Sequence, residues 1–209
     1  MRVHSLDGLK RLKEEGLRSL FPPRTKVVVG MATCGRAAGA EAVFKAIQEE
    51  ANKRNLDFEV TSTGCLGFCQ KEPLVDVIKP GWPRIVYAEM SAEKGREIVA
   101  ALADEQVVPQ YILCQIMEEA NLVEDFVRKY PMDTLPKGIK KVPKYEEVPF
   151  FSKQEKRILR NCGLINPDKI EEYIAQGGYL ALVTALSKLK SDGIIEQVKI
   201  GRASCRERV

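Results

Sequence analysis

The stretch that decides the fold is KVVVGMATCGRAAGAEAVFKAIQEEANKRNLDFEVTSTG, residues 26–64. Residues 26–30 form a β-branched run between chain-breaking residues, which predicts a fully buried strand. From 37 to 52 the apolar residues recur at helical spacing with charged residues between them, and 56–63 alternate as a strand. This order predicts a strand–helix–strand unit whose two strands are parallel neighbours.

Two more strands are predicted downstream, over PLVDVIK (73–79) and RIVYAEM (84–90), separated by the turn sequence PGWP. Residues 91–102 predict a helix that Ser91 caps. The expected fold class is therefore α/β, with one mixed sheet and flanking helices. The order of elements is compatible with the thioredoxin-like fold, in which the later strands pair antiparallel.

The expected domain organisation has five parts: a leader helix (1–23), a thioredoxin-like domain (24–104), a linker (105–148), a helical region (149–199) and a tail (200–209). Within the linker, YILCQIMEE predicts a short helix with Cys114 on its apolar face. Pro167 begins one helix of the following region and Ser191 caps another. The tail, IGRASCRERV, looks like a translated sequencing-library adapter, so it and Cys205 are set aside.

Composition narrows the class of protein. The chain has 209 residues with a net charge of +4, from 33 basic and 29 acidic side chains, so no nucleic-acid partner is expected. It contains no apolar stretch long enough to span a bilayer and no signal-peptide pattern near its start. We therefore expect a cytoplasmic protein without direct membrane insertion. In that reducing compartment its six cysteines are expected to serve metals rather than disulfides.

Three of the cysteines have the placement that an iron–sulfur cluster requires. A [2Fe-2S] cluster takes four ligands, usually thiolates, from chain segments that converge in space. Cys34 follows the first strand, and Cys65 and Cys69 form a C-x3-C pair after the second, so the two loops meet at one end of the sheet. Cys34, Cys65 and Cys69 are the predicted metal ligands. The alternatives are ordinary buried cysteines beside turn glycines, or a zinc site, for which a nearby histidine is missing.

Two stretches carry a family resemblance. KVVVGMATCGRAAGA with TGCLGFCQKEPLVDV is one, and PFFSKQEKRILRNCGLINPDKIEEYIAQGGYLAL (149–182) is the other. Together they resemble the NADH-binding flavoprotein subunit of complex I and of related NAD-linked hydrogenases and formate dehydrogenases, over nearly all of residues 24–199. The first stretch is similar to the thioredoxin-like [2Fe-2S] ferredoxin domain of bacterial members, and the second to the entry of the flavoprotein domain.

The resemblance implies an oxidoreductase of the NADH dehydrogenase type. The whole protein would pass electrons from NADH through FMN to iron–sulfur clusters, including a [4Fe-4S] cluster, with the flavin supplying the hydride chemistry. Its partners would be a thioredoxin-like ferredoxin subunit and an iron–sulfur subunit, either in the cytoplasm or held at the inner face of the membrane through them. The glycine-rich loop that binds FMN and NADH is expected beyond residue 199. The chain alone is therefore expected to be inactive, without catalytic or flavin-binding residues.

One departure from the family pattern concerns the fourth cluster ligand. Members with four cysteines carry the first of them five positions before the second, and Val29 stands there in this chain. Either the fourth ligand comes from elsewhere, with Cys114 the candidate and Cys162 expected to be structural, or the domain is a cluster-free docking module for a partner subunit. A thiol–disulfide protein is a third hypothesis, although the sequence has no C-x-x-C motif.

Overall fold

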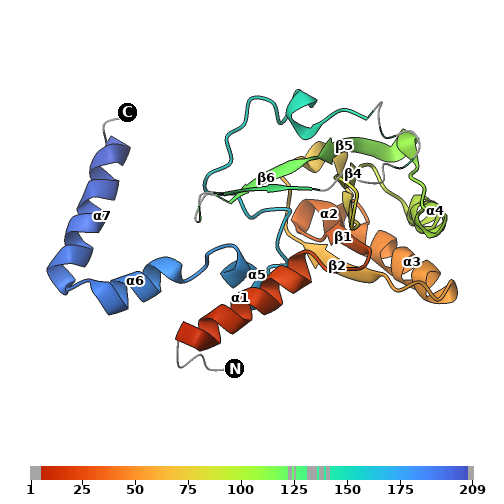
Figure 1. Cartoon of the computed structure of the whole chain (residues 1–209). Coiled ribbons are helices and arrows are strands. Elements are labelled where there is room, and N and C mark those ends of the chain that lie inside the picture. The colour runs from red at the N-terminus through yellow and green to blue at the C-terminus, as the bar shows by residue number, and fades with distance from the viewer. Residues whose placement is uncertain are drawn as a thin grey trace. The chain divides into compact units, whose positions relative to one another are not determined.

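The computed structural model describes residues 6–121, 124, 126–130, 136, 139 and 142–206 (Figure 1). The chain divides into two compact units, Met1–Gln176 and Gly177–Val209. The helices and strands of the first unit are α1 (Leu6–Leu20), β1 (Lys26–Gly30), α2 (Thr33–Ala37), α3 (Ala40–Lys53), β2 (Glu59–Thr63), β3 (Val75–Ile78), β4 (Arg84–Tyr87), α4 (Ala92–Ala103), β5 (Ile112–Ile116), β6 (Glu118–Asn121), β7 (Phe126–Lys129) and α5 (Ile170–Ala175). Short 3-10 turns lie at Cys69–Lys71 (η1), Pro109–Tyr111 (η2) and Tyr145–Glu147 (η4).

A five-stranded mixed sheet in the order β2-β1-β3-β4-β5 forms the centre of the first unit. Strand β1 pairs parallel with β2, placing Val28 opposite Thr61, and antiparallel with β3. Strands β3, β4 and β5 then pair antiparallel in succession. The predicted α/β class with a mixed sheet and flanking helices is confirmed.

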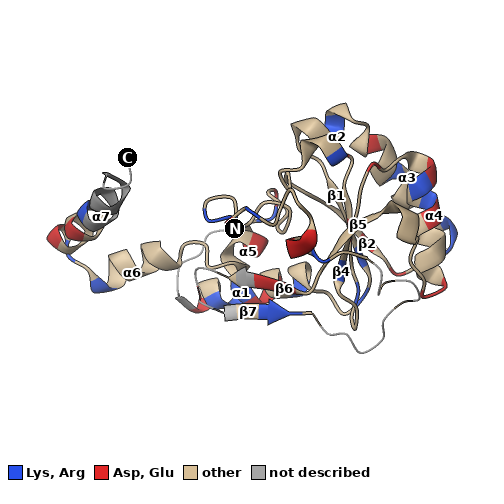
Figure 2. Ribbon diagram, turned by 90° about the horizontal axis from the view of Figure 1, so that it is seen from above, with Lys and Arg blue, Asp and Glu red and all other residues tan. Residues whose placement is uncertain are grey.

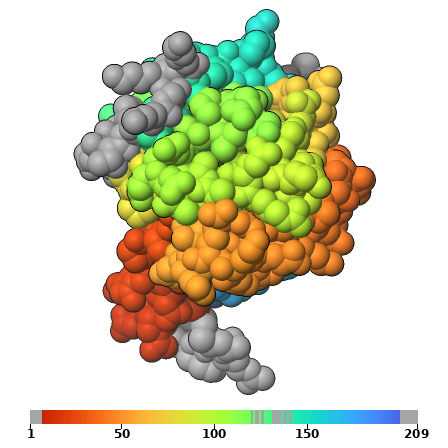
Figure 3. Space-filling view, turned by 90° about the vertical axis from the view of Figure 1, so that its right-hand side faces the viewer, coloured from red at the N-terminus to blue at the C-terminus, as the bar shows by residue number. Residues whose placement is uncertain are grey.

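One face of the sheet is covered by α3 and α4, which lie side by side in Figure 3. Their apolar faces enclose one core cluster with alternate residues of the strands, including Val27 and Val29, and with Trp82 from the turn between β3 and β4. The predicted cap of α4 is confirmed, because the Ser91 side chain accepts a hydrogen bond from the Lys94 amide at 3.3 Å. This face therefore follows directly from the local periodicity of the sequence.

The opposite face of the sheet is covered by segments from both ends of the unit. Helix α1 lies against α5 there, and Figure 2 shows these two helices across the sheet from α3 and α4. A second core cluster on this side joins strand residues such as Val28 and Val86 to Phe68 and Phe151. Residues 142–176 therefore pack on the sheet and belong to its unit.

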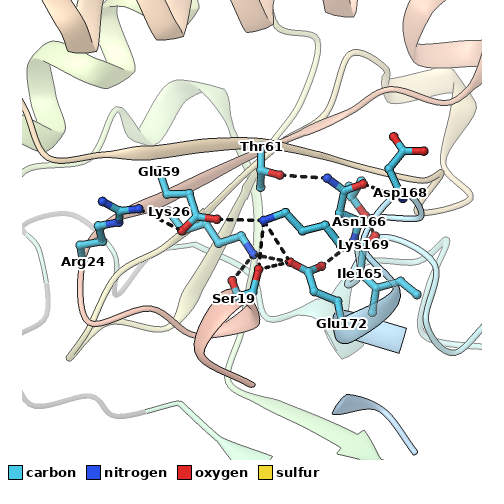
Figure 4. Close-up of polar contacts among 11 residues, drawn as sticks. Ser19, Arg24, Lys26, Glu59, Thr61, Ile165, Asn166, Asp168, Lys169 and Glu172 are labelled. Carbon is cyan, nitrogen blue, oxygen red and sulfur yellow. Dashed lines mark hydrogen bonds and ion pairs between the residues drawn. The ribbon is translucent and has the colours of Figure 1, made fainter. Parts of the chain in front are cut away.

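A buried ion pair fastens α5 to the first strand (Figure 4). Lys26 in β1 and Glu172 in α5 have side chains 2% and 0% exposed, and their Nζ and Oε1 atoms lie 3.3 Å apart. Ser19 Oγ donates to the same Oε1 at 2.6 Å, and the Asn166 amide donates to Oε2 at 2.6 Å. The carboxylate thus receives donors from α1, β1 and the loop before α5.

The helix predicted around Cys114 is wrong, because Ile112–Ile116 form strand β5 at the edge of the sheet. A short apolar run fits a helix or a strand equally well by periodicity, and here the pairing with β4 decides. Strands β6 and β7 pair with each other just beyond it, so the segment expected as a linker contributes three strands.

The second unit contains α6 (Leu180–Lys188) and α7 (Ser191–Arg206). Several of its large apolar side chains are exposed, among them Leu182, Leu186 and Val198. The adapter origin of residues 200–209 stays a prediction, and 207–209 lie outside the described residues. No helix in the described part of the chain is long and apolar enough to cross a bilayer.

Candidate metal centre

The three predicted ligands lie at one end of the central sheet. Cys34 is in the first turn of α2, four residues after β1 ends, and Cys65 follows β2 by two residues. Cys69 begins η1. Because β1 and β2 are parallel, their carboxyl ends lie at the same edge, and the two cysteine-bearing loops leave from there.

The thiols of Cys65 and Cys69 are neighbours, with their Sγ atoms 3.9 Å apart. Two thiolates bound tetrahedrally to one metal at about 2.3 Å each would lie about 3.8 Å apart. The distance between these two sulfur atoms therefore suits ligands of the same metal. The Gly67 amide donates a hydrogen bond to Cys65 Sγ at 3.2 Å, a contact of the kind that tunes cluster potentials. Cys34 lies on the adjacent loop and is the largest influence on the pKa of the Cys69 thiol, which it raises.

Glycine is required at two positions around these thiols. A side chain at Gly35, next to Cys34, would overlap the carbonyl oxygen of Gly30, so only glycine allows α2 to begin this close to β1. Gly67 has a φ of +99°, a left-handed conformation that other residues adopt only with strain. The backbone therefore approaches closely at the thiols, as an iron–sulfur site demands.

The surroundings of the Cys65 and Cys69 thiols raise their pKa values. Burial raises the pKa of Cys65, partly offset by the Gly67 amide. The neighbouring Cys34 thiol raises the pKa of Cys69. Metal binding must displace the thiol protons, so uptake is expected to be favoured at higher pH.

Aromatic side chains from the entry stretch hold the loop that carries Cys65 and Cys69. Phe68 stacks on Phe150 with ring centroids 4.0 Å apart and meets Phe151 edge-on at 5.5 Å. Lys156 Nζ donates to the Leu66 carbonyl at 2.6 Å. The two stretches that carry the family resemblance are therefore in direct contact, which their separation in sequence did not predict.

Neither remaining thiol of the described residues joins the three. Cys114 is fully buried in β5 within the second core cluster, where burial raises its pKa to about 12. Cys162 is half-buried beside Lys156 and Leu66 in a cavity of about 320 Å³. The suggestion that Cys114 folds back as the missing ligand therefore fails, because its strand fixes it in the core.

Reactivity towards iodoacetamide should separate these thiols. In metal-free protein at pH 8 we expect exposed Cys69 to be alkylated readily and Cys114 to stay unmodified until denaturant is added. A pKa of about 12, against an ordinary 9.0, leaves Cys114 with about a thousandfold less thiolate. Peptide mass spectrometry over time measures both sites. Equal labelling of the two in the folded protein would contradict the placement of β5.

The Cys65 and Cys69 thiols have the spacing that one metal of a thiolate site requires. Within the described residues, no three side chains of His, Cys, Asp or Glu surround one point as a single metal requires. A [2Fe-2S] cluster divides four ligands between two irons. A close thiol pair with a third thiol beside it therefore suits this cluster, with one ligand still to be found. Sequence reasoning missed a carboxylate at the same place, that of Glu72, whose position three residues after Cys69 is the only local signal.

Comparisons with known proteins place the chain in a family. No family model matches it. It is similar to two structures of a thioredoxin-like [2Fe-2S] ferredoxin from Aquifex aeolicus, each with a TM-score of 0.39. The first is 24% identical and the match covers 43% of this chain and 96% of that chain. The second is 22% identical, with 44% of this chain and 92% of that chain covered. It is 30% identical over 100 residues to the NADP-reducing hydrogenase subunit HndB of Solidesulfovibrio fructosivorans, a match that covers 46% of this chain and 79% of that protein. The chain thus belongs to the family of the hydrogenase subunit HndB.

Proposed function

We propose that this chain is part of an electron-transfer subunit of a multi-subunit oxidoreductase, and that its first unit holds a [2Fe-2S] relay on Cys34, Cys65 and Cys69. The observation that carries the proposal is the placement of the thiols, with Cys65 Sγ 3.9 Å from Cys69 Sγ and Cys34 on the neighbouring loop at the same edge of the sheet. The kinship with a hydrogenase subunit supports the same class of chemistry.

The residues around the thiols have distinct roles in this proposal. A bound cluster would accept and pass on single electrons. The Gly67 amide would stabilise the negative charge on Cys65 sulfur, and Phe68 with Phe150 would hold the loop in place. The sheet edge fixes Cys34 relative to the pair, so the site needs little reorganisation.

The finer proposal concerns the source of the electrons. We infer that the whole protein takes them from a pyridine nucleotide through FMN. Residues 149–176, expected from the sequence to open the flavin domain, pack on the sheet of the first unit, so the helices of residues 177–199 are the ones that would begin that domain. The resemblance favours NADH, whereas the relative in the comparison is a subunit of an NADP-reducing hydrogenase. Its partners would be other iron–sulfur subunits of the complex, and a [4Fe-4S] cluster would lie further along the same chain.

The test is iron content. The full chain, purified without oxygen and reconstituted with ferrous iron and sulfide, should bind about two irons per chain and show a visible charge-transfer band. Cys65→Ser should retain roughly a tenth of that iron or less, since a ligand is lost. Cys114→Val, which removes a core thiol, should keep the cluster. Far-UV circular dichroism verifies that each variant is folded. A colourless, iron-free wild type with an intact fold would overturn the proposal.

That outcome would favour the second candidate, a cluster-free docking module. The contact between the thiol loop and the entry stretch is the observation behind it, because the rings of Phe68, Phe150 and Phe151 pack together and hold the loop through protein contacts. In this case replacement of all three cysteines by serine should leave binding to a partner subunit unchanged, as measured by co-purification of the complex.

A further inference from the structure

The carboxyl group of Glu72 is buried without full hydrogen bonding. The residue is 8% exposed. Its Oε2 accepts a hydrogen bond from the Leu74 amide at 2.8 Å, but Oε1 has no hydrogen-bond partner among the described residues. Buried polar atoms are nearly always paired, so an unpaired carboxyl oxygen points to something that binds there.

Glu72 lies beside the chain segments that carry the three predicted ligands. A Cβ built on Gly35, the neighbour of Cys34, would lie 3.2 Å from Oε2. The carboxyl group also lines a small cavity with Gly64 and Leu66, the two neighbours of Cys65. The Glu72 amide also donates a hydrogen bond to the Cys69 carbonyl at 3.4 Å.

We propose that Glu72 supplies the fourth ligand of the iron–sulfur site, a carboxylate oxygen beside the thiolates of Cys34, Cys65 and Cys69. This inference rests on the proposed function. The free Oε1 is the atom that would bind iron, while Oε2 keeps its bond to the Leu74 amide. Metal-binding carboxylates are commonly hydrogen-bonded through their other oxygen, which fixes their orientation.

Ligation involves no electron transfer. Oε1 donates a lone pair to iron, and any proton on the carboxyl group is released to solvent, as it is from each thiol. Burial raises the pKa of Glu72. In family members with four cysteines a thiolate stands at the position of Val29. Here the carboxylate of Glu72, from the loop that follows β2, would replace that missing ligand.

The other candidates are less well placed. Cys114 is enclosed in the core by β5, and the cavity that contains Cys162 is lined by Arg84, Arg160 and Lys156 and by none of the three thiols. Of these three candidate ligands, only Glu72 is buried, has an oxygen without a hydrogen-bond partner, and lies beside the chain segments that carry the three cysteines.

The experiment compares the full chain with Glu72→Gln after anaerobic reconstitution with ferrous iron and sulfide. Glutamine keeps the size of the side chain and can still accept from the Leu74 amide, but it is a poor iron ligand. We expect Glu72→Gln to lose its iron to a chelator at least about tenfold faster and to change the electron paramagnetic resonance spectrum of the reduced cluster. Glu49→Gln, on the exposed side of α3, and Cys162→Ser should match the wild type.

The melting temperature of the metal-free chain distinguishes a ligand from a residue that only supports the fold. If Glu72 only supported the fold, Glu72→Gln should lower the melting temperature of the metal-free chain, whereas a ligand role leaves it unchanged or raised. A wild type without iron overturns the proposed function. A wild type with iron, together with a Glu72→Gln variant of equal iron retention and identical spectrum, overturns the Glu72 assignment alone. Loss of the cluster in Cys162→Ser but not in Glu72→Gln also overturns it and assigns the ligand to that thiol.

Discussion

Glu172→Gln is expected to lower the free energy of unfolding of the first unit by about 3 to 5 kcal/mol, because it leaves the Lys26 ammonium buried without a counter-charge. Both side chains are almost fully enclosed, and the carboxylate also receives Ser19 Oγ and the Asn166 amide. Urea titration followed by the fluorescence of Trp82, the single tryptophan, measures the effect in this unit.

The matched control is Glu59→Gln, whose carboxylate pairs with Arg24 and Lys169 nearer the surface. Pairs of that kind contribute about 1 kcal/mol or less, so this variant should stay close to the wild type. In the double variant Lys26→Met/Glu172→Gln much of the lost stability should return, since no unpaired charge remains. A loss below about 1 kcal/mol in Glu172→Gln would show that α5 does not depend on the pair.

Arg84→Met is the second change with a large expected effect, again about 3 to 5 kcal/mol. The Arg84 guanidinium is buried, donates from Nε to Asp76 Oδ2 at 3.0 Å, and also pairs with Glu119 and the Gly163 carbonyl. It thereby links β3, β4, β6 and the loop before α5. Methionine fills much of the volume but leaves the Asp76 carboxylate without its partner.

The loss in Arg84→Met should depend on pH. Burial already raises the pKa of Asp76 above its ordinary 3.8, and removal of the guanidinium should raise it further. A carboxyl group with a raised folded-state pKa contributes fully at low pH, and that contribution falls as pH rises through the folded-state pKa. The variant should therefore be closest to the wild type near pH 4 and furthest at pH 7.

Asp76→Asn combined with Arg84→Met provides the control for this prediction. The double variant lacks the Asp76 carboxyl group and keeps only Glu119 nearer the surface, so the extra pH dependence that comes from Asp76 should disappear. Unfolding monitored by Trp82 fluorescence at several pH values compares the two. A destabilisation of Arg84→Met that is the same at pH 4 and pH 7 would contradict the assignment to Asp76.

Local patterns were sufficient for most of the sheet. The run at 26–30 predicted a buried strand, and the alternation at 56–63 predicted a neighbouring strand. Both predictions were possible because the spacing of apolar residues within a short stretch distinguishes a strand from a helix. Because these two strands are parallel neighbours, the loops that carry Cys34 and the pair Cys65 and Cys69 were expected at the same end of the sheet. Their role as metal ligands stays a prediction that the iron analysis tests.

Where local patterns were ambiguous, prediction failed. The apolar run around Cys114 has a length that suits either element, and its pairing with β4 depends on residues about thirty positions away. The entry stretch predicted a helix near Glu172, but the helix begins at Ile170 instead of Pro167, and nothing in the stretch indicated where it would pack.

By itself the sequence determined the α/β class, the parallel start of the sheet and the clustering of three cysteines at its edge, since each depends on short-range periodicity and chain connectivity. The tertiary structure alone decided that α5 returns to β1 through Lys26 and Glu172, residues 146 positions apart. It also decided that Glu72 faces the cysteine loops with a free carboxyl oxygen. Burial of a polar atom is a property of everything packed around it, so no local pattern encodes it.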